Sequence, residues 1–329
     1  MRFLPTDEQR DFVRTLRRLL DASEVPAAVR AWGAGDHAPG RALWTRLADT
    51  GLFALAAGEE HDGLGPLPLE AALGFVELGR AGVPGPVVET VAASVLLAGL
   101  DDEGPAKRFL PGLLSGGASA SLTLPDAAPY ALDADAATYC FTVSRAGELR
   151  LADPDGGPVL RSTDPTRRLL RPPAGGGELL ARGPSVTAAA RSALGWARLL
   201  TAAQCLGVGE TLLTRTVEYA KQRTQFGTRI GGFQAVKHRL ADTLLGLEFA
   251  RPLVWAAGLS LDPGEVAAAK LAAGEASYAA AMTALQLHGA VGYTEELDLS
   301  LWLRKARPLR DAWGTPSACR AAVLGAARR

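Results

Sequence analysis

The sequence has few cysteines, no net charge and no long run of uncharged apolar residues, and each absence excludes a class of protein. Its three cysteines, Cys140, Cys205 and Cys319, are far apart and odd in number, so they indicate neither a disulfide framework nor a metal-binding set. The 35 basic residues equal the 35 acidic residues, which argues against nucleic acid as the main partner. No apolar run is long enough to span a bilayer, and residues 1–9 contain no apolar signal region. We therefore expect a cytoplasmic protein without a bound metal.

The 329 residues, of which 48% are hydrophobic, are enough for two or three units around a sizeable core. Apolar residues recur at helical spacing in residues 1–117 and again in residues 186–329. Residues 118–185 instead hold short β-prone runs separated by turn residues. This pattern predicts an α+β fold with an N-terminal helical domain, a small middle β domain and a C-terminal helical bundle.

Local signals place several of the helices. The stretch 87–100 is almost wholly apolar, so we expect a buried helix there. The C-terminal region predicts helices over about 186–223, 233–259 and 264–288. Asp262 with a proline directly after it is a good start signal for the last of these.

A polar stretch at residues 219–230 separates two of these helices. Gly227 is placed to stop the first helix. The stretch also carries Lys221, Arg223 and Arg229, and guanidinium donors at a helix junction suit a phosphate-bearing ligand. A solvated basic turn is the alternative, because turns are usually polar.

Two motifs in this part of the chain are more specific. Residues 223–242 contain Arg-x-Gln-Phe-Gly, then Ile, then Phe-Gln and then Leu-Ala-Asp. Residues 286–295 read Gln-Leu-His-Gly-Ala-Val-Gly-Tyr-Thr-Glu. The first motif resembles the C-terminal signature of acyl-CoA dehydrogenases, and the second resembles their Gln-x-x-Gly-Gly-x-Gly-Tyr segment, with Ala290 at the second glycine. The resemblance runs from about residue 3 to about residue 315 and implies a four-helix C-terminal bundle through which subunits associate.

The resemblance also implies an activity. Acyl-CoA dehydrogenases introduce an α,β double bond into an acyl-CoA thioester: a carboxylate removes the α-proton, and the β-hydrogen leaves as hydride to FAD. The resemblance therefore implies FAD as cofactor, a dimer or tetramer, and an electron-transferring flavoprotein as acceptor. It does not identify the acyl group.

Seven residues match positions that contact FAD in that family. Arg223 and Phe226 would meet the FAD of a neighbouring subunit, and Arg223 would bind its pyrophosphate. Thr123 lies in a strand that matches the family's flavin-contacting Val-Thr-Glu-Pro strand, although Leu124 replaces the glutamate. Three further positions match contacts to the pyrophosphate and adenosine part of FAD: Gln286, Gly289 and Ala290. Gln234 is a weaker candidate.

The base that the reaction needs is missing from both places where the family carries it. Trp313 stands where most members have a glutamate, and an indole cannot accept a proton. Ala197 stands at the second known position, directly before an arginine. Asp311, Glu295 and Glu296 are the weak candidates for a substitute.

These observations leave three interpretations open. The chain could be a flavin-binding subunit that needs a homologous, base-bearing subunit. It could be a self-sufficient acyl-CoA dehydrogenase whose base has moved, with Asp311 as the candidate. It could also be a non-catalytic flavin-binding or scaffold homologue.

Overall fold

The computed structural model of the chain describes residues 4–153, 159–173 and 175–326. Its first part is helical and begins with a capping box, in which Thr6 and Gln9 exchange side-chain and backbone hydrogen bonds. The helices here are α1 (Asp7–Asp21), α2 (Val25–Gly33), α3 (Ala38–Ala48), α4 (Pro68–Ala81), α5 (Val87–Ala98) and α6 (Glu103–Leu114), with short 3₁₀ turns η1 (Phe53–Ala56) and η2 (Glu59–His61).

Strands follow in the middle of the chain. A four-stranded sheet has the order β1-β3-β4-β7 and a three-stranded sheet the order β2-β6-β5. Within the first sheet, β1 runs parallel to β3 and the other neighbours are antiparallel. The strands are β1 (Ala120–Thr123), β2 (Ala131–Leu132), β3 (Tyr139–Val143), β4 (Glu148–Ala152), β5 (Leu160–Arg161), β6 (Arg168–Leu170) and β7 (Glu178–Arg182).

The rest of the described chain is again helical and is built around α7 (Pro184–Gln222), a helix of 39 residues. Asp262 caps α9 as predicted, since its carboxylate accepts hydrogen bonds from the backbone of Gly264 and Glu265 at 2.8 and 3.0 Å. The remaining elements are β8 (Thr224–Gln225), β9 (Thr228–Arg229), η3 (Ile230–Gly232), α8 (Gln234–Ser260), α9 (Pro263–His288), η4 (Gly289–Tyr293), α10 (Leu299–Asp311) and α11 (Pro316–Ala326).

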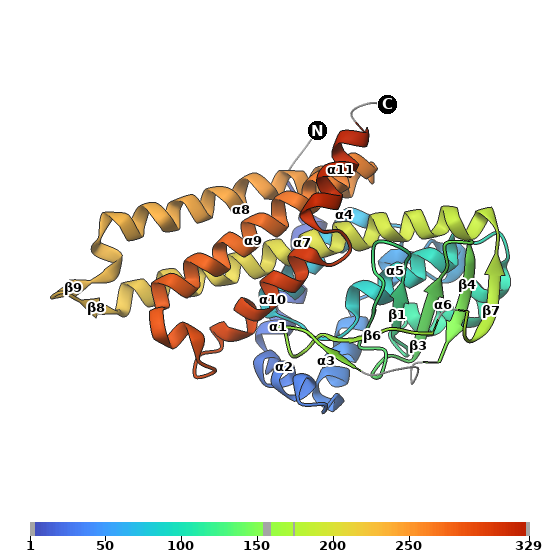
Figure 1. Cartoon of the computed structure of the whole chain (residues 1–329), viewed down its shortest axis with the longest axis horizontal. Helices are drawn as coiled ribbons and strands as arrows, with labels where there is room; N and C mark the ends of the chain where they lie inside the picture. Colours follow the sequence, from blue (N-terminus) through green and yellow to red (C-terminus); the bar gives the residue numbers. More distant parts are fainter. Residues whose placement is uncertain (1–3, 154–158, 174, 327–329) are drawn as a thin grey trace.

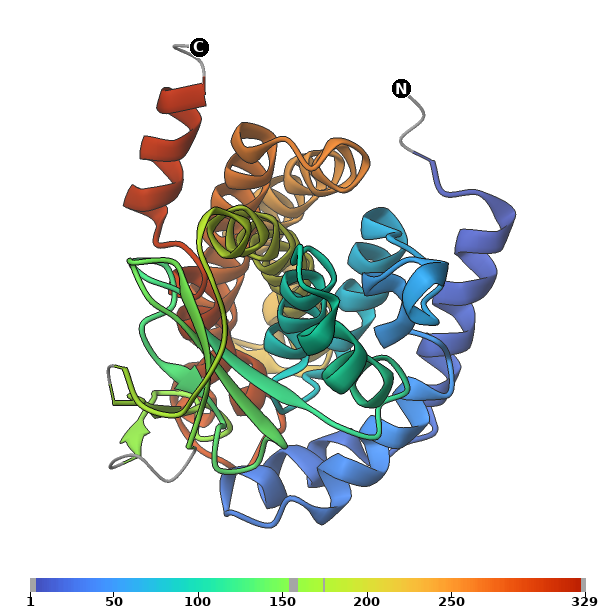
Figure 2. The ribbon, with the colours of Figure 1, turned by 90° about the vertical axis from the view of Figure 1, so that its right-hand side faces the viewer.

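The α7 helix joins the parts of the fold. It packs against α4 and α5 of the N-terminal helical part and against α8, α9 and α10 in the bundle (Figure 1). The strands lie on one side of α5 and α6, and the first helices of the chain lie on the other (Figure 2). The α5 helix is buried along most of its length, as its apolar sequence predicts.

The predicted fold class is confirmed: helices at both ends of the chain enclose a small β region. The division into domains at 117/118 and 185/186 stays a prediction, and residues 1–3 and 327–329 of its outer domains lie outside the described residues. Within the residues that the structure describes, none of the helices is long and apolar enough to cross a membrane.

A buried ion pair ties the β region to the bundle. Lys305 on α10 approaches the carboxylate of Asp164 at 3.0 Å, and both side chains are more than nine-tenths buried. Thr166 bonds to both partners, donating to Asp164 at 2.7 Å and accepting from Lys305 at 3.2 Å. Burial opposes the charge on Asp164, but the ammonium and the hydrogen bonds together hold its pKa below the ordinary value.

We expect Asp164→Asn to lower the free energy of unfolding by about 3–5 kcal/mol, because it leaves the Lys305 ammonium buried without a counter-charge. Urea unfolding at neutral pH measures this change. The matched control is Asp298→Asn, which breaks the more exposed pair with Arg30 and should cost less than about 1 kcal/mol. Equal losses in the two variants would contradict a special role for the buried pair.

Candidate functional site

The polar stretch at residues 219–230 is not a simple turn between helices. The α7 helix ends at Gln222, and residues 224–229 form a hairpin in which Thr224 pairs with Arg229. The two residues at its tip, Phe226 and Gly227, have φ of 54° and 77°, the left-handed backbone of a tight hairpin turn. The expectation that Gly227 stops the helix was therefore wrong, because Arg223 already leaves the helix in an extended conformation.

Packing gathers the other predicted FAD contacts next to this hairpin. The end of α9 lies against the end of α7, where the rings of His288 and Tyr219 stack at 4.1 Å. Gly289 follows with φ of 62°, and a Cβ added there would meet no atom within 4 Å. A ligand could therefore approach the backbone closely at this glycine.

Most of the predicted FAD contacts near the hairpin are exposed, and Gly289 is half-buried. Phe226 is 92% exposed, an unusual state for a large apolar side chain. The other exposed members of the set are Arg223, Gln234, Gln286 and Ala290. We call the surface formed by Arg223, Phe226, Gln234, Gln286, Gly289 and Ala290 the signature end.

Thr123 does not belong to the signature end. It lies at the end of β1, only 8% exposed. The β1 strand and the β8–β9 hairpin lie in opposite halves of the molecule along its long axis (Figure 1). One chain therefore does not bring together all the residues that match FAD contacts.

The two positions matched to the family's base, in contrast, come together. Ala197 is fully buried on α7, and its neighbour Arg198 donates from Nε to the backbone oxygen of Trp313 at 3.0 Å. Trp313 lies between α10 and α11, is only 3% exposed and has φ of 59°. Positions far apart in sequence thus border one place in the fold.

A carboxylate is present at this place, but it comes from a different helix. Glu89 on α5 is 4% exposed and accepts a hydrogen bond from the indole nitrogen of Trp313 at 3.2 Å. Burial raises the pKa of Glu89, and the positive charge of Arg167 and the bond from Trp313 only partly offset this. A buried carboxyl group with a raised pKa has the properties of a general base.

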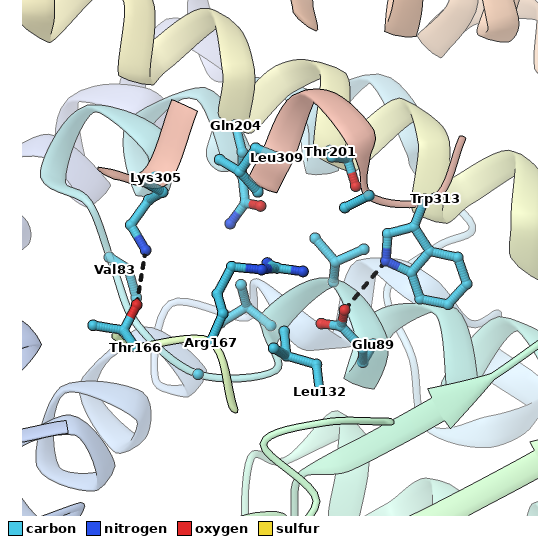
Figure 3. Close-up of a pocket in the computed structure, with 14 residues that line it drawn as sticks. Val83, Glu89, Leu132, Thr166, Arg167, Thr201, Gln204, Lys305, Leu309 and Trp313 are labelled. Atoms are coloured by element: carbon cyan, nitrogen blue, oxygen red, sulfur yellow. Dashed lines mark hydrogen bonds between the residues drawn. The ribbon is translucent and has the colours of Figure 1, made fainter. Parts of the chain in front are cut away.

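The cavity around Glu89 is very small. Its volume is about 20 Å³, which is room for about one water molecule. Figure 3 shows the Arg167 side chain reaching into it between Gln204 and Glu89, with Lys305 at one side and Trp313 at the other. The chain's own side chains therefore fill most of the space beside Trp313 and Glu89.

The three substitute carboxylates proposed from the sequence lie elsewhere. Asp311 pairs with Arg307 at 3.1 Å and is not among the residues that line the cavity. Glu295 pairs with Arg304 and is largely exposed. Glu296 is exposed as well. None of them lies beside Trp313 in the way that Glu89 does.

Sequence reasoning missed both Glu89 and Arg167. A single glutamate within the otherwise apolar stretch 87–100 was a usable signal, because a charged residue is rarely buried without a partner. Arg167 gave no comparable signal, since it lies in an arginine-rich strand region and only the fold brings it to Glu89.

Comparisons with known proteins agree with the sequence motifs. Two family models match the chain, the acyl-CoA dehydrogenase N-terminal domain over residues 6–117 and the C-terminal domain over residues 187–324. The acyl-CoA dehydrogenase IpdE2 of Mycobacterium tuberculosis is 36% identical over 304 residues, which make up 92% of either chain. The chain belongs to the acyl-CoA dehydrogenase family.

Further relatives support this assignment. IpdE2 of Mycolicibacterium smegmatis is 31% identical over 319 residues, covering 94% of this chain and 96% of that protein. The solved structure of butyryl-CoA dehydrogenase from Megasphaera elsdenii has the same fold, with a TM-score of 0.84, 23% identity and complete coverage of both chains. Acyl-CoA dehydrogenases are FAD-linked oxidoreductases that act on CH–CH bonds, so the class implied by the motifs is confirmed.

The signature end and the cavity at Glu89 differ in how well they suit FAD. The signature end offers the Arg223 guanidinium, two amides and the open backbone at Gly289, a donor set that fits a pyrophosphate. The cavity at Glu89 does not fit a flavin ring or a thioester, because sites for small organic ligands usually enclose about 300–1,000 Å³ and this one has about 20 Å³.

We expect the free energy of unfolding of Glu89→Gln to increase relative to that of wild type as the pH rises. The pKa of Glu89 is higher in the folded chain than its ordinary value of 4.5. Between the two values the folded state holds more protons than the unfolded state, so wild-type stability falls as the pH increases. The glutamine variant has no such proton to lose and keeps an oxygen that can accept from Trp313.

Urea unfolding of both proteins at about pH 5 and about pH 8 tests this expectation. Glu218→Gln on α7, an exposed glutamate, is the control and should show no such trend. A difference between Glu89→Gln and wild type that stays constant with pH would show that the buried carboxyl group does not titrate in this range.

Proposed function

We propose that the chain is a flavin-binding subunit of an acyl-CoA dehydrogenase and that a homologous subunit supplies the catalytic glutamate. The observation that carries the proposal is the contrast within one chain. The signature end is exposed, whereas Trp313 and Ala197 leave both family positions of the base without a glutamate, and the small cavity beside them has no room for a thioester. The signature end would then complete an FAD site on the partner.

Exposed apolar side chains support a partner subunit. On α8, Phe249 is 72% exposed, and Leu244, Leu245 and Leu253 are each more than 40% exposed. Contiguous apolar surface on a protein often marks an interaction site. We propose that this face of the bundle and the signature end meet other subunits in a dimer or tetramer.

The substrate of the assembly would be an acyl-CoA thioester, as the family implies. The M. tuberculosis and M. smegmatis relatives are themselves named acyl-CoA dehydrogenases. Transfer of electrons to an electron-transferring flavoprotein and a cytoplasmic location stay predictions.

Glu89 favours a second candidate, a self-sufficient enzyme with a displaced base. It is the carboxylate in contact with Trp313, whereas Asp311 pairs with Arg307 outside the cavity. For Glu89 to act, Arg167 and Trp313 would have to move aside to admit the thioester. We favour the subunit role because it needs no such rearrangement.

A visible spectrum during anaerobic addition of acyl-CoA thioesters tests the subunit role. We expect the purified chain alone to show either no flavin or flavin that does not bleach. Co-expression with a homologue that has glutamate at the position of Trp313 should give flavin that bleaches. Bleaching by the chain alone would exclude the subunit role, and loss of that bleaching in Glu89→Gln, but not in Asp311→Asn, would establish the displaced base.

In the co-expressed complex we expect Arg223→Gln to weaken FAD binding at least about tenfold, because a hydrogen bond to a charged group contributes about 1.5–3 kcal/mol. Flavin fluorescence titration of the apo-complex measures the affinity. Arg191→Gln, an exposed arginine near the other end of α7, is the matched control and should bind FAD like wild type. Equal affinity in all three proteins would show that the signature end does not hold the cofactor.

A further inference from the structure

The turn that carries Trp313 is bound by two cationic side chains from other helices. Lys270 on α9, which is 1% exposed, donates from Nζ to the backbone oxygen of Arg310 at 2.8 Å and to that of Gly314 at 3.5 Å. Arg198 on α7 donates from Nε to the backbone oxygen of Trp313 at 3.0 Å. Three carbonyl groups of one turn therefore accept from cations. We call Lys270 and Arg198 the turn-binding cations.

Neither of these cations has a carboxylate partner. In the part of the chain that the structure describes, no carboxylate lies within ion-pair distance of Lys270 or Arg198, and Asp311 pairs with Arg307 instead. Burial lowers the pKa of Lys270, and the positive charge of Arg198 acts in the same direction. The carbonyl end of α10, at Arg310, carries the negative end of the helix dipole. The bonds to the turn therefore offset part of the cost of burying these charges.

The backbone of the turn is strained. Trp313 has φ of 59°, which is uncommon for a residue with a bulky side chain, and Gly314 follows with φ of 151°. A residue other than glycine in such a region costs about 1–3 kcal/mol and keeps this conformation only where its surroundings hold it. A Cβ added at Gly314 would lie 3.2 Å from Nε of Arg198, so the guanidinium packs directly against the turn.

This backbone conformation determines where the indole of Trp313 lies. The indole nitrogen donates to Glu89 at 3.2 Å, and the ring closes one side of the cavity of about 20 Å³ (Figure 3). Because the backbone dihedrals set the direction of the Cα–Cβ bond and the rotamers open to it, a relaxed turn would aim the indole elsewhere. The strained backbone and the closed cavity are therefore linked.

We propose that the turn-binding cations are positioning residues, which fix the backbone of the turn so that the indole of Trp313 stays against Glu89 and the cavity stays closed. Neither Lys270 nor Arg198 is among the residues that line the cavity, so both act through the backbone of the turn. The proposal concerns the interior of this chain alone, and its failure would leave the subunit role untouched.

Hydrogen exchange of the indole N–H groups, followed by NMR of the full chain labelled with ¹⁵N-tryptophan, tests the proposal. The chain has six tryptophans, and the signal of Trp313 is the one lost in Trp313→Phe. We expect Lys270→Met and Arg198→Gln each to accelerate exchange at Trp313 at least about tenfold, because exchange requires the indole to leave Glu89. Lys107→Met removes a lysine that is 73% exposed and should change none of the signals.

Two other tryptophans separate positioning from general destabilisation. The indole nitrogens of Trp32 and Trp302 also donate to buried acceptors, Asp133 at 3.1 Å and the backbone oxygen of Gly79 at 3.2 Å. A variant that only destabilises the whole fold accelerates exchange at all protected indoles together, whereas a loosened turn accelerates it at Trp313 alone.

Two variants keep the test valid if Lys270→Met does not fold. Arg198 is half-buried, so Arg198→Gln probes the turn from α7. Lys270→Gln keeps a donor for the turn carbonyls, and we expect it to accelerate exchange at Trp313 less than Lys270→Met does. Equal acceleration at Trp313, Trp32 and Trp302, or unchanged exchange at Trp313 when either cation is removed, would overturn the proposal.

Discussion

The fold depends on a close crossing between α4 and α7 that only glycine permits. A Cβ at Gly79 would lie 2.2 Å from the backbone oxygen of Gln204, and one at Gly207 would lie 2.0 Å from that of Val76. Such distances are impossible for real side chains, so the two backbones touch directly. This crossing connects the N-terminal helices to the bundle. It also determines where along α5 the polar side chains of α7 lie.

The cavity at Glu89 follows from that arrangement. Gln204 is one turn of α7 from Thr201, and both line the cavity that Glu89, Arg167 and Trp313 complete. The ion pair of Lys305 with Asp164 holds the segment that contains Arg167 against α10. Glu89 from α5, Arg167 from the β region and Trp313 from the turn after α10 therefore meet in one polar cluster, in which the indole of Trp313 donates to Glu89.

The sequence predicted the elements of the fold better than their junctions. The helices over 186–223, 233–259 and 264–288 are close to α7, α8 and α9, because each has an apolar face several turns long. The hairpin at 224–229 was missed, since Gly227 has the same sequence signal as a helix stop and as a hairpin turn. Motif resemblance identified the family and the signature end, whereas the cluster of Glu89 and Arg167 required the packing of residues that are distant in sequence.

The contrast between the exposed signature end and the small interior cavity has a physical explanation. A polar surface that serves a partner costs little to keep, because water satisfies its donors when the partner is absent. An interior pocket that no longer holds a ligand is different, because a void destabilises by about 24 cal/mol per Å³, or about 7 kcal/mol for 300 Å³ if it stays dry. We infer that the indole of Trp313 and the side chain of Arg167 reduce such a void to about 20 Å³. Trp313, at the position matched to the family's glutamate, is thus also one of the side chains that fill the space beside Glu89.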